Sequence, residues 1–469
     1  MSDAAANRSF DVVVVGGGAV GENAAARAAR GGLSVALVEA ELLGGECSYW
    51  ACMPSKALIR TSQAVHAARA IGGVTASFDP ADVLSRRDSF TSHWDDSGQV
   101  EWAEGAGITV IRGHATLTGE RTLTLAGEGD LAATHAVVLA TGSVPTEPPV
   151  PGLAQTPHWG SRAATAAKSV PDSLIVMGSG VVGCELAQAY ARLGSTVTLI
   201  SHGDAVLEKL EPAAGELVRQ GLAADGITLR MQASVREVSR DDAGVHVRLA
   251  GGTEVVATEL LVATGRRPAT DELGLDAVGL EPGSVLEVDD SGLVAGVAGQ
   301  WLYACGDVTG RAPLTHQGKY AARVVGDVIV ARATGAEQHT GAWGKHAATA
   351  DHAAVPQVVF TDPEVAFVGR TAAQVEQAGI AHDVVAIDLA VAGSALHADG
   401  YTGKAIMVVD RARQVVLGVT FVGQDVAELV HAGTVAVVGE VPLQRLWHAV
   451  PSYPTMNEVW LRLLEAYGL

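Results

Sequence analysis

The sequence has few cysteines, an excess of negative over positive charge, and no long apolar run. Four cysteines among 469 residues are too few for the disulfide framework of a small secreted domain. The 32 Lys and Arg against 52 Asp and Glu give a net charge of -20, which argues against nucleic acid or an anionic membrane as the partner. Because the sequence shows neither a secretory signal pattern nor a membrane-spanning run, we expect a cytoplasmic protein.

A complete dinucleotide-binding fingerprint lies near the start of the chain. A β-branched run over 10–15 precedes three glycines, a segment of helical composition follows them, and a second apolar run over 34–38 ends at Glu39. In such a unit the glycines allow a tight turn near a pyrophosphate, the helix N-terminus favours the phosphate charge, and the acid binds ribose hydroxyls. The glycines of this G-x-G-x-x-G motif are Gly16, Gly18 and Gly21.

The same unit recurs in the middle of the chain. An apolar run over 173–177 precedes a second G-x-G-x-x-G motif. Each half then closes with an apolar run into Ala-Thr-Gly, at 140–142 and at 263–265, which we interpret as strands returning to a nucleotide-binding domain. Two dinucleotides are therefore expected in one chain. The second set of glycines is Gly178, Gly180 and Gly183.

Two of the cysteines, Cys47 and Cys52, follow the first fingerprint, and Met-Pro-Ser-Lys56 comes directly after them. A structural or metal-binding pair needs further ligands nearby, and the surrounding sequence offers none. We interpret the pair as redox-active and predict no metal site. Pro54 is expected to mark a turn or irregularity in the helix that follows.

Further motifs extend the pattern: Gly44-Gly45-Glu46-Cys47, Tyr303-Ala-Cys-Gly-Asp307 and the segment 359–369. With the two fingerprints, they resemble the flavin-dependent pyridine nucleotide-disulfide oxidoreductases, such as lipoamide dehydrogenase, glutathione reductase and mercuric reductase. The resemblance covers nearly the whole chain. It implies an α/β fold with two Rossmann-like doubly wound nucleotide-binding domains and a C-terminal α+β dimerisation domain.

The length of 469 residues corresponds to roughly three domains. A proline-rich stretch over 146–157 is typical of a linker. We predict an FAD-binding domain over 1–152 and 269–345, an inserted NAD(P)-binding domain over 153–268, and an interface domain over 346–469.

The resemblance also implies the chemistry. A reduced nicotinamide passes hydride to FAD, and the reduced flavin cleaves a Cys47–Cys52 disulfide. Cys52 then contacts the flavin, and Cys47 meets the acceptor. The family pairs a lysine at the position of Lys56 with a glutamate at the position of Glu185, next to the flavin.

The same resemblance assigns the cofactor contacts residue by residue, with Asp307 on the ribityl chain of the flavin. The implied FAD-binding residues are Gly16, Gly18, Gly21, Glu39, Gly45, Lys56, Thr141, Gly142 and Asp307. The implied NAD(P)-binding residues are Gly178, Gly180, Gly183, Ser201, His202 and Gly265.

The C-terminal motif departs from the family. Thiol-disulfide reductases have His-Pro-Thr-x-x-Glu, in which the histidine serves the outer cysteine of the partner subunit, whereas this chain has Tyr453-Pro-Thr-Met-Asn-Glu458. An unperturbed tyrosine titrates near ~10 against ~6.5 for histidine, so it is a poor proton acceptor. We place Tyr453 and Glu458 in the active site across a homodimer, and we expect weak oxidation of dithiols such as dihydrolipoamide.

The interval between the cysteines also departs from the family, because Ser48, Tyr49, Trp50 and Ala51 replace small or aliphatic residues. Aromatic groups here narrow the route to Cys47, which favours a quinone or a specialised disulfide as acceptor; core packing of Trp50 is an equally good explanation. Two other functions stay open. One is a flavin-centred reductase of quinone or oxygen with a vestigial or regulatory disulfide, and the other is metal reduction of the mercuric reductase kind. Mercury ranks lower because a vicinal cysteine pair is missing near the C-terminus.

The choice of nicotinamide cofactor depends on the position that matches Glu39 in the second unit. That position is Ser201, followed by His202. The acid that binds an NAD ribose and repels a 2′-phosphate is therefore missing, which favours NADPH. The preference is slight, since no arginine follows in the same turn.

Overall fold

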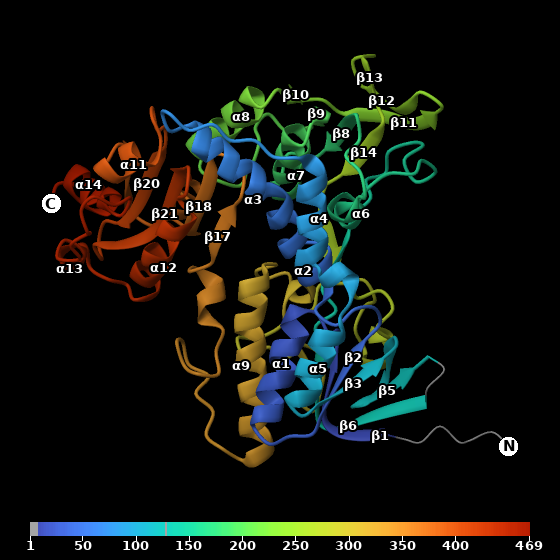
Figure 1. Cartoon of the computed structure of the whole chain (residues 1–469). Coiled ribbons are helices and arrows are strands. Elements are labelled where there is room, and N and C mark those ends of the chain that lie inside the picture. Colours follow the sequence, from blue (N-terminus) through green and yellow to red (C-terminus); the bar gives the residue numbers. More distant parts are fainter. Residues whose placement is uncertain (1–7, 127–128) are drawn as a thin grey trace. The chain divides into compact units, whose positions relative to one another are not determined.

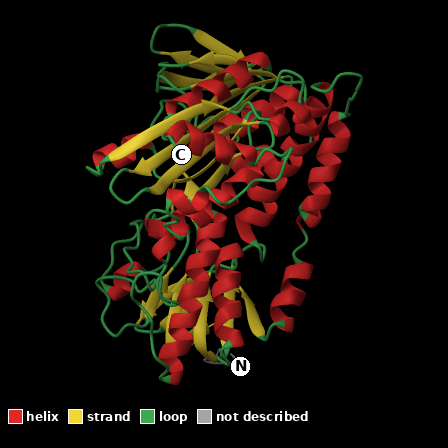
Figure 2. Cartoon of the chain, turned by 90° about the vertical axis from the view of Figure 1, so that its left-hand side faces the viewer, coloured by secondary structure: helices red, strands yellow, loops and turns green. Residues whose placement is uncertain are grey.

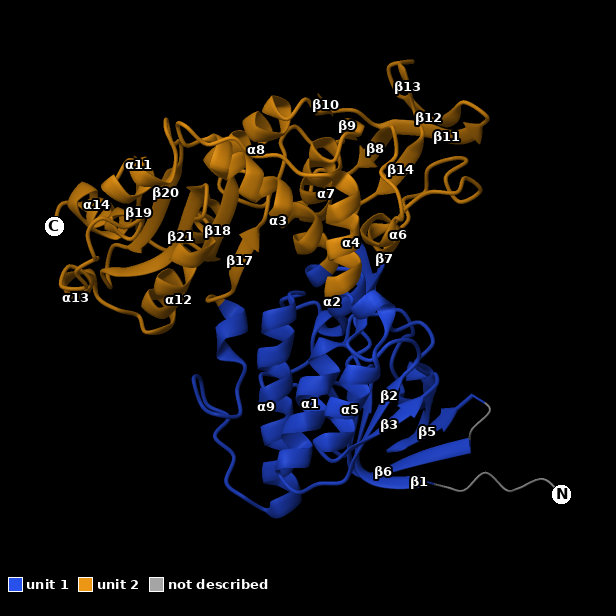
Figure 3. Cartoon of the chain, in the orientation of Figure 1, with its two compact units in different colours: residues 1–53, 91–144, 266–352 blue, residues 54–90, 145–265, 353–469 orange. Residues whose placement is uncertain are grey.

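The computed structural model describes residues 8–126 and 129–469. The chain forms two compact units, each assembled from separate stretches of sequence (Figure 3). Unit 1 comprises residues 1–53, 91–144 and 266–352, and unit 2 comprises residues 54–90, 145–265 and 353–469. The predicted domain segments divide the chain differently, and their boundaries stay a prediction.

Unit 1 is built on a seven-stranded sheet in the order β3-β2-β1-β6-β5-β4, with β16 paired to β6. β1 pairs in parallel with both β2 and β6. Its last four residues, 12–15, are buried valines, as expected for a central parallel strand that is covered on both faces. The strands are β1 (Arg8–Val15), β2 (Val35–Glu39), β3 (Ile108–Arg112), β4 (Ala115–Gly119), β5 (Thr122–Leu125), β6 (Gly129–Leu139) and β16 (Leu302–Ala304).

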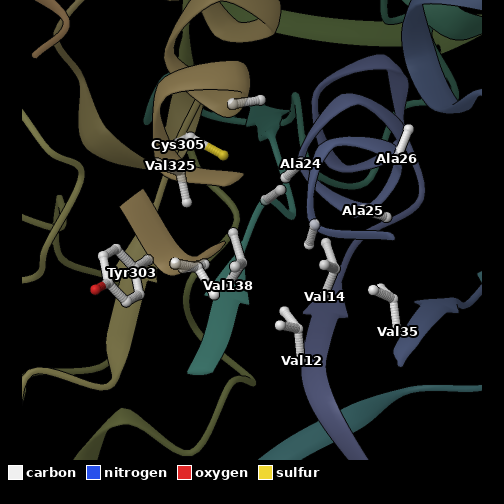
Figure 4. Close-up of a cluster of buried hydrophobic side chains, with 14 of the residues drawn as sticks. Val12, Val14, Ala24, Ala25, Ala26, Val35, Val138, Tyr303, Cys305 and Val325 are labelled. Carbon is white, nitrogen blue, oxygen red and sulfur yellow. The ribbon is translucent and has the colours of Figure 1, made fainter. Parts of the chain in front are cut away.

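Two helices of unit 1, α1 (Ala19–Arg30) and α9 (Thr315–Thr334), lie side by side against this sheet (Figures 1 and 2). Their close approach requires a glycine, because a Cβ on Gly326 would lie 2.5 Å from the Cβ of Arg27. Arg27 also forms an ion pair with Asp327 at 2.6 Å. Figure 4 shows part of the resulting core, where side chains of the helices and the sheet meet, among them Val14, Ala24, Val138, Tyr303 and Val325.

The helical segment around the cysteines is broken in two. α2 (Gly45–Tyr49) ends before Trp50, and α3 (Cys52–Arg69) begins at Cys52 and continues into unit 2. Pro54 lies in the first turn of α3, where a missing N–H group loses no intrahelical hydrogen bond. The expectation of an irregularity at Pro54 is therefore wrong, since the break lies before α3. A later helix, α5 (Ser97–Gly105), lies in unit 1.

Unit 2 contains a four-stranded parallel sheet in the order β10-β9-β8-β14. Buried side chains of α3, α4 (Pro80–Phe90), α7 (Val181–Arg192) and α8 (Pro212–Ala224) share one apolar cluster with this sheet. A three-stranded antiparallel sheet follows in the chain, in the order β11-β12-β13. The strands are β8 (Ser173–Met177), β9 (Thr196–Ile200), β10 (Thr228–Arg230), β11 (Val235–Asp241), β12 (Gly244–Leu249), β13 (Glu254–Ala257) and β14 (Glu259–Val262), and α6 (Ser161–Ala166) precedes them. A separate two-stranded sheet, which lies in unit 1 except for Pro145, joins β7 (Ser143–Pro145) and β15 (Arg266–Pro268).

The last part of unit 2 is a five-stranded antiparallel sheet in the order β17-β18-β21-β20-β19. Helices α12 and α14 pack on it, and their buried side chains form a common cluster with β20 and β21. The elements are β17 (Pro356–Val359), β18 (Glu364–Gly369), α10 (Ala372–Gln377), β19 (His382–Asp388), α11 (Ala392–His397), β20 (Lys404–Asp410), β21 (Val415–Gly423), α12 (Val430–Val438), α13 (Leu443–Leu446) and α14 (Glu458–Tyr467).

Among the described helices, none has both the length and the apolar character that a membrane span requires.

Candidate active site

The first and third glycines of the first loop have no room for side chains. Gly16 has φ +99°, and a Cβ there would lie 2.5 Å from the carbonyl oxygen of Ala140. A Cβ on Gly21 would lie 1.8 Å from the carbonyl oxygen of Gly16. Gly18 is the N-cap of α1 and provides no side-chain cap for the first N–H groups of the helix. This cradle fits a pyrophosphate.

The acid at the end of β2 is held beside that loop. Glu39 accepts hydrogen bonds from the N–H groups of Gly17 at 2.7 Å and Glu41 at 2.8 Å. Its carboxylate retains lone pairs for the hydroxyls of a ribose. Gly45 packs against the same loop, because a Cβ on Gly45 would lie 2.7 Å from the Cα of Gly18. The loop, the acid and Gly45 together fit the adenosine diphosphate part of FAD.

A second group of expected FAD contacts is held together by hydrogen bonds in unit 1. The Thr141 hydroxyl donates to the carbonyl of Ala269 at 2.7 Å, and the N–H of Ala269 donates to the carbonyl of Gly142 at 3.0 Å. Asp307 accepts a 2.6 Å hydrogen bond from the Ser143 hydroxyl. Sequence reasoning missed Ser143, because a serine after Thr-Gly has no distinctive pattern of its own.

The two cysteines lie in unit 1, Cys47 in α2 and Cys52 at the start of α3, and both are in the reduced thiol form. The Sγ atom of Cys52 lies 3.2 Å from the Oγ1 atom of Thr315. A hydrogen bond with Cys52, together with burial, raises the pKa of Cys47 far above its usual value. Sequence reasoning missed Thr315, and its only signal was the Leu-Thr-His-Gln stretch over 314–317.

The aromatic residues between the cysteines have different environments. Tyr49 is 1% exposed and belongs to the core, and its carbonyl accepts a 3.2 Å hydrogen bond from the indole of Trp94. Trp50 is half-buried, with its ring edge-on to Tyr49 at a centroid distance of 5.7 Å. Core packing therefore describes Tyr49 better than Trp50.

The predicted lysine–glutamate pair is formed within unit 2. Lys56 Nζ lies 2.7 Å from Glu185 Oε2, and the Glu185 side chain is only 4% exposed. The other oxygen of Glu185 accepts a 2.9 Å hydrogen bond from the N–H of Phe360. The ammonium of Lys56 also lies 4.8 Å from the centroid of the Phe360 ring. Lys56 follows Cys52 by one helical turn in α3.

The second glycine loop repeats the geometry of the first. A Cβ on Gly178 would lie 2.4 Å from the carbonyl oxygen of Ala263, and a Cβ on Gly183 would lie 2.0 Å from that of Gly178. Gly180 is the N-cap of α7, again without a side-chain cap, and its surroundings are open. Gly265 has φ +141° and no heavy atom within 4 Å of a Cβ position. The loop fits a second dinucleotide.

The residue at the end of β9 differs from its counterpart in the first unit. Ser201 is 6% exposed, and its hydroxyl accepts hydrogen bonds from the Ser179 hydroxyl at 2.8 Å and the Gly203 N–H at 3.2 Å. His202 is exposed beside it. Ser201 therefore stabilises its own loop.

The two C-terminal residues, Tyr453 and Glu458, differ in exposure. Tyr453, which precedes a cis peptide bond to Pro454, is 77% exposed. Glu458 begins α14 and is 6% exposed, and among the described residues its Oε2 atom has no hydrogen-bond partner.

Comparison with known proteins agrees with this geometry. The model of the pyridine nucleotide-disulphide oxidoreductases matches residues 10–337, and the model of their dimerisation domain matches residues 355–463. A mercuric reductase from Streptomyces lividans is 33% identical over 97% of this chain and 95% of that enzyme. Dihydrolipoyl dehydrogenase 2 from Haloarcula marismortui is 32% identical over 96% of this chain and 94% of that enzyme.

Solved structures show the same fold. The Cu(II) complex of the HOCl-induced flavoprotein disulfide reductase RclA from Escherichia coli is 25% identical, with a TM-score of 0.83 and coverage of 98% of this chain and 99% of that chain. LpdA from Mycobacterium tuberculosis is 25% identical, with a TM-score of 0.80 and coverage of 98% of this chain and 100% of that chain. The predicted α/β class with a C-terminal dimerisation domain is confirmed.

Proposed function

Because this chain belongs to the pyridine nucleotide-disulphide oxidoreductases, we propose that it reduces a disulfide or a related acceptor with electrons from NAD(P)H through FAD, Cys47 and Cys52. The observation that best supports this function is the placement of the two reduced cysteines around Thr315 in unit 1. A pair with a purely structural role would not need a hydroxyl at one sulfur.

The two sulfurs have different tasks. When bound, FAD supplies the relay that accepts hydride from the nicotinamide and delivers two electrons to the disulfide. Cleavage of the Cys47–Cys52 bond with two electrons and one proton leaves one thiolate and one thiol. The Thr315 hydroxyl, 3.2 Å from the sulfur, stabilises a thiolate at Cys52. The raised pKa of Cys47, due to its hydrogen bond with Cys52 and to burial, keeps the proton there until an acceptor arrives.

Lys56 and Glu185 act together in this proposal. The carboxylate of Glu185, buried and bonded to the backbone of Phe360, fixes the direction of the Lys56 ammonium. A cation held in this way stabilises negative charge on a reduced flavin. The residues of the first fingerprint, with Thr141, Gly142 and Asp307, would hold FAD, and those of the second would hold the nicotinamide dinucleotide.

We further infer a homodimer in which Tyr453 and Glu458 complete the site of the partner subunit. The match to a dimerisation domain supports this arrangement. Large apolar side chains of this region are exposed in the single chain, including Val450 at 84% and Tyr453 at 77%, and such surface is typical of an interface. Tyr453 would donate a hydrogen bond to the acceptor, which favours a quinone or a specialised disulfide over lipoamide. We also infer a cytoplasmic location.

A metal ion is the second candidate acceptor. Two adjacent thiols bind soft ions, the Streptomyces lividans relative is named a mercuric reductase, and the RclA structure is a Cu(II) complex. Among residues 8–126 and 129–469, however, no group of three or more His, Cys, Asp or Glu side chains could hold a metal. A disulfide or quinone therefore ranks first.

Anaerobic titration of the purified protein with NADPH tests the proposal. We expect a long-wavelength absorption band on two-electron reduction, because a thiolate at Cys52 would contact a bound flavin, and we expect Cys52→Ser to abolish it. Cys305→Ala, which changes a buried cysteine outside the pair, is the matched control and should keep the band. Direct bleaching of the wild-type flavin without the band would favour a flavin-centred reductase with a vestigial disulfide.

A further inference from the structure

The carboxyl edge of the parallel sheet in unit 2 brings three chain segments together. The N–H of Gly178, the first glycine of the second fingerprint, donates to the carbonyl of Ile200 at 2.9 Å. On the other side of Ile200, β10 pairs with β9 in parallel register, and its last residue, Arg230, lies opposite Ile200. The N–H of Ser201 then donates to the carbonyl of Arg230 at 2.9 Å. Arg230 is thus fixed at the edge where the nucleotide-binding loop leaves the sheet.

The side chain of Arg230 is exposed, and it forms no ion pair or side-chain hydrogen bond with any residue that the structure describes. Most arginines in this sheet region differ from it. Arg240, for example, binds Glu259 at 2.7 Å, and Arg192 binds Asp225 at 2.9 Å. A guanidinium that has no partner among the described residues, at a nucleotide-binding edge, can bind a phosphate with two parallel hydrogen bonds.

The neighbouring residue at the end of β9 does not compete for the ribose. Ser201 is buried and its hydroxyl is engaged with Ser179 and Gly203. An acid at this position would bind the 2′-hydroxyl of NADH and repel the 2′-phosphate of NADPH. Because the Ser201 hydroxyl is turned into its own loop, Ser201 neither binds the 2′-hydroxyl of NADH nor repels the 2′-phosphate of NADPH.

Two acidic residues of the same loop, Asp204 and Glu208, are exposed and act against a phosphate. The Glu208 carboxylate lies over the backbone of Gly203, with Oε1 only 1.7 Å from the point that a Cβ on Gly203 would occupy. Glu208 is exposed, so water and salt weaken its effect. Its position provides a variant whose effect should be opposite in sign to that of Arg230.

We propose that Arg230, on the strand beside β9, determines the choice of nicotinamide cofactor by binding the 2′-phosphate of NADPH. This inference rests on the proposed function only in that the second fingerprint must bind a nicotinamide dinucleotide. The sequence analysis considered only the turn after β9, which has no arginine. The proposal places the phosphate-binding cation in the next strand, β10.

Calorimetric titration of the FAD-loaded protein with 2′,5′-ADP and with 5′-AMP at low salt tests the proposal without turnover. We expect the wild type to bind 2′,5′-ADP more tightly, and Arg230→Gln to lose about tenfold in affinity for 2′,5′-ADP with little change for 5′-AMP. Arg236→Gln, which removes another exposed arginine from β11, is the matched control and should change neither affinity. Glu208→Gln should raise the affinity for 2′,5′-ADP a few-fold.

Equal losses for both nucleotides in Arg230→Gln, or no loss, would overturn the role of Arg230 and leave the nicotinamide site intact. A fall in 5′-AMP affinity in Glu208→Gln, without a gain for 2′,5′-ADP, would show that Glu208 binds the ribose hydroxyls and that the site prefers NADH. Binding of neither nucleotide by the wild type would contradict the nicotinamide site itself, and with it this inference.

Discussion

The two nucleotide-binding units have nearly the same backbone loop and differ in the residues around it. In both, the third glycine leaves no room for a side chain, because a Cβ on it would lie only 1.8 Å (Gly21) or 2.0 Å (Gly183) from the carbonyl oxygen of the first glycine. At the following strand end, Glu39 extends its carboxylate to the loop, whereas Ser201 is turned into its own loop. We infer that the glycines specify dinucleotide binding in both loops, and that the ends of the neighbouring strands, including Arg230 in β10, specify which ribose is accepted.

Substitution of the third glycine in each unit should have the largest effect and should separate the two sites. Gly21→Ala would push a methyl group into the Gly16 carbonyl, so we expect loss of bound FAD. Gly183→Ala would do the same to Gly178, so we expect FAD to be retained and reduction by NADPH to fall at least about a hundredfold. The flavin content of the purified protein and its rate of reduction measure the two effects.

Gly98→Ala is the control for this pair, because Gly98 lies in α5 and a Cβ there would meet no heavy atom within 4 Å. Loss of FAD in Gly183→Ala, or its retention in Gly21→Ala, would contradict the assignment of the two loops.

The local parts of this comparison could be predicted from the sequence. A positive φ or a Cβ clash excludes every residue but glycine at these positions. Gly16 and Gly178 therefore allow the two nucleotide-binding loops to be predicted from the local sequence alone. The partner of Lys56 was found only through family resemblance, since Glu185 lies 129 positions away. Composition and motif spacing cannot predict a contact between residues so far apart in the sequence.

Other parts of the site depend on strand order and helix packing, which short motifs do not specify. Arg230 lies beside Ile200 because β10 pairs with β9, and Thr315 lies beside Cys52 because α9 begins there. Tyr49 and Trp50 are neighbours of similar polarity, and only the break between α2 and α3 determines that Tyr49 is the one in the core.

An acid like Glu39 can be placed at the matching position of the second nucleotide-binding loop by the substitution Ser201→Glu. We expect an effect of intermediate size. Because the Ser201 side chain is buried in its own loop, Ser201→Glu places a carboxylate in a buried site. We expect a loss of about 3 kcal/mol in the free energy of unfolding. NADH affinity should not improve. Chemical denaturation and nucleotide titration measure both quantities, with the exposed Ser234→Glu as control. An unchanged stability together with a switch to NADH would show that the side chain at 201 reaches the ribose.

The residue after the third glycine differs between the two nucleotide-binding loops. We expect this difference to have the smallest effect, which is a change in the pH dependence of stability. In the second unit it is Cys184, whose pKa burial raises to about 12, so it is neutral under ordinary conditions. In the first unit it is Glu22, whose pKa burial raises to about 7, against a weaker opposite effect of Lys319. Its Oε1 atom is buried without a hydrogen-bond partner among the described residues.

A raised folded-state pKa means that the folded chain holds the Glu22 proton more tightly than the unfolded chain does. Stability should therefore decrease as pH rises from about 4.5 to about 7, and remain lower above that range. Glu22→Gln keeps the shape without the charge, so it should match the wild type near pH 4 and exceed it by on the order of 2 kcal/mol near pH 8. Denaturation at the two pH values measures this, with the exposed Glu101→Gln as control. An equal offset at both pH values would mean that Glu22 acts by packing, and that the two units differ in shape at this position rather than in charge.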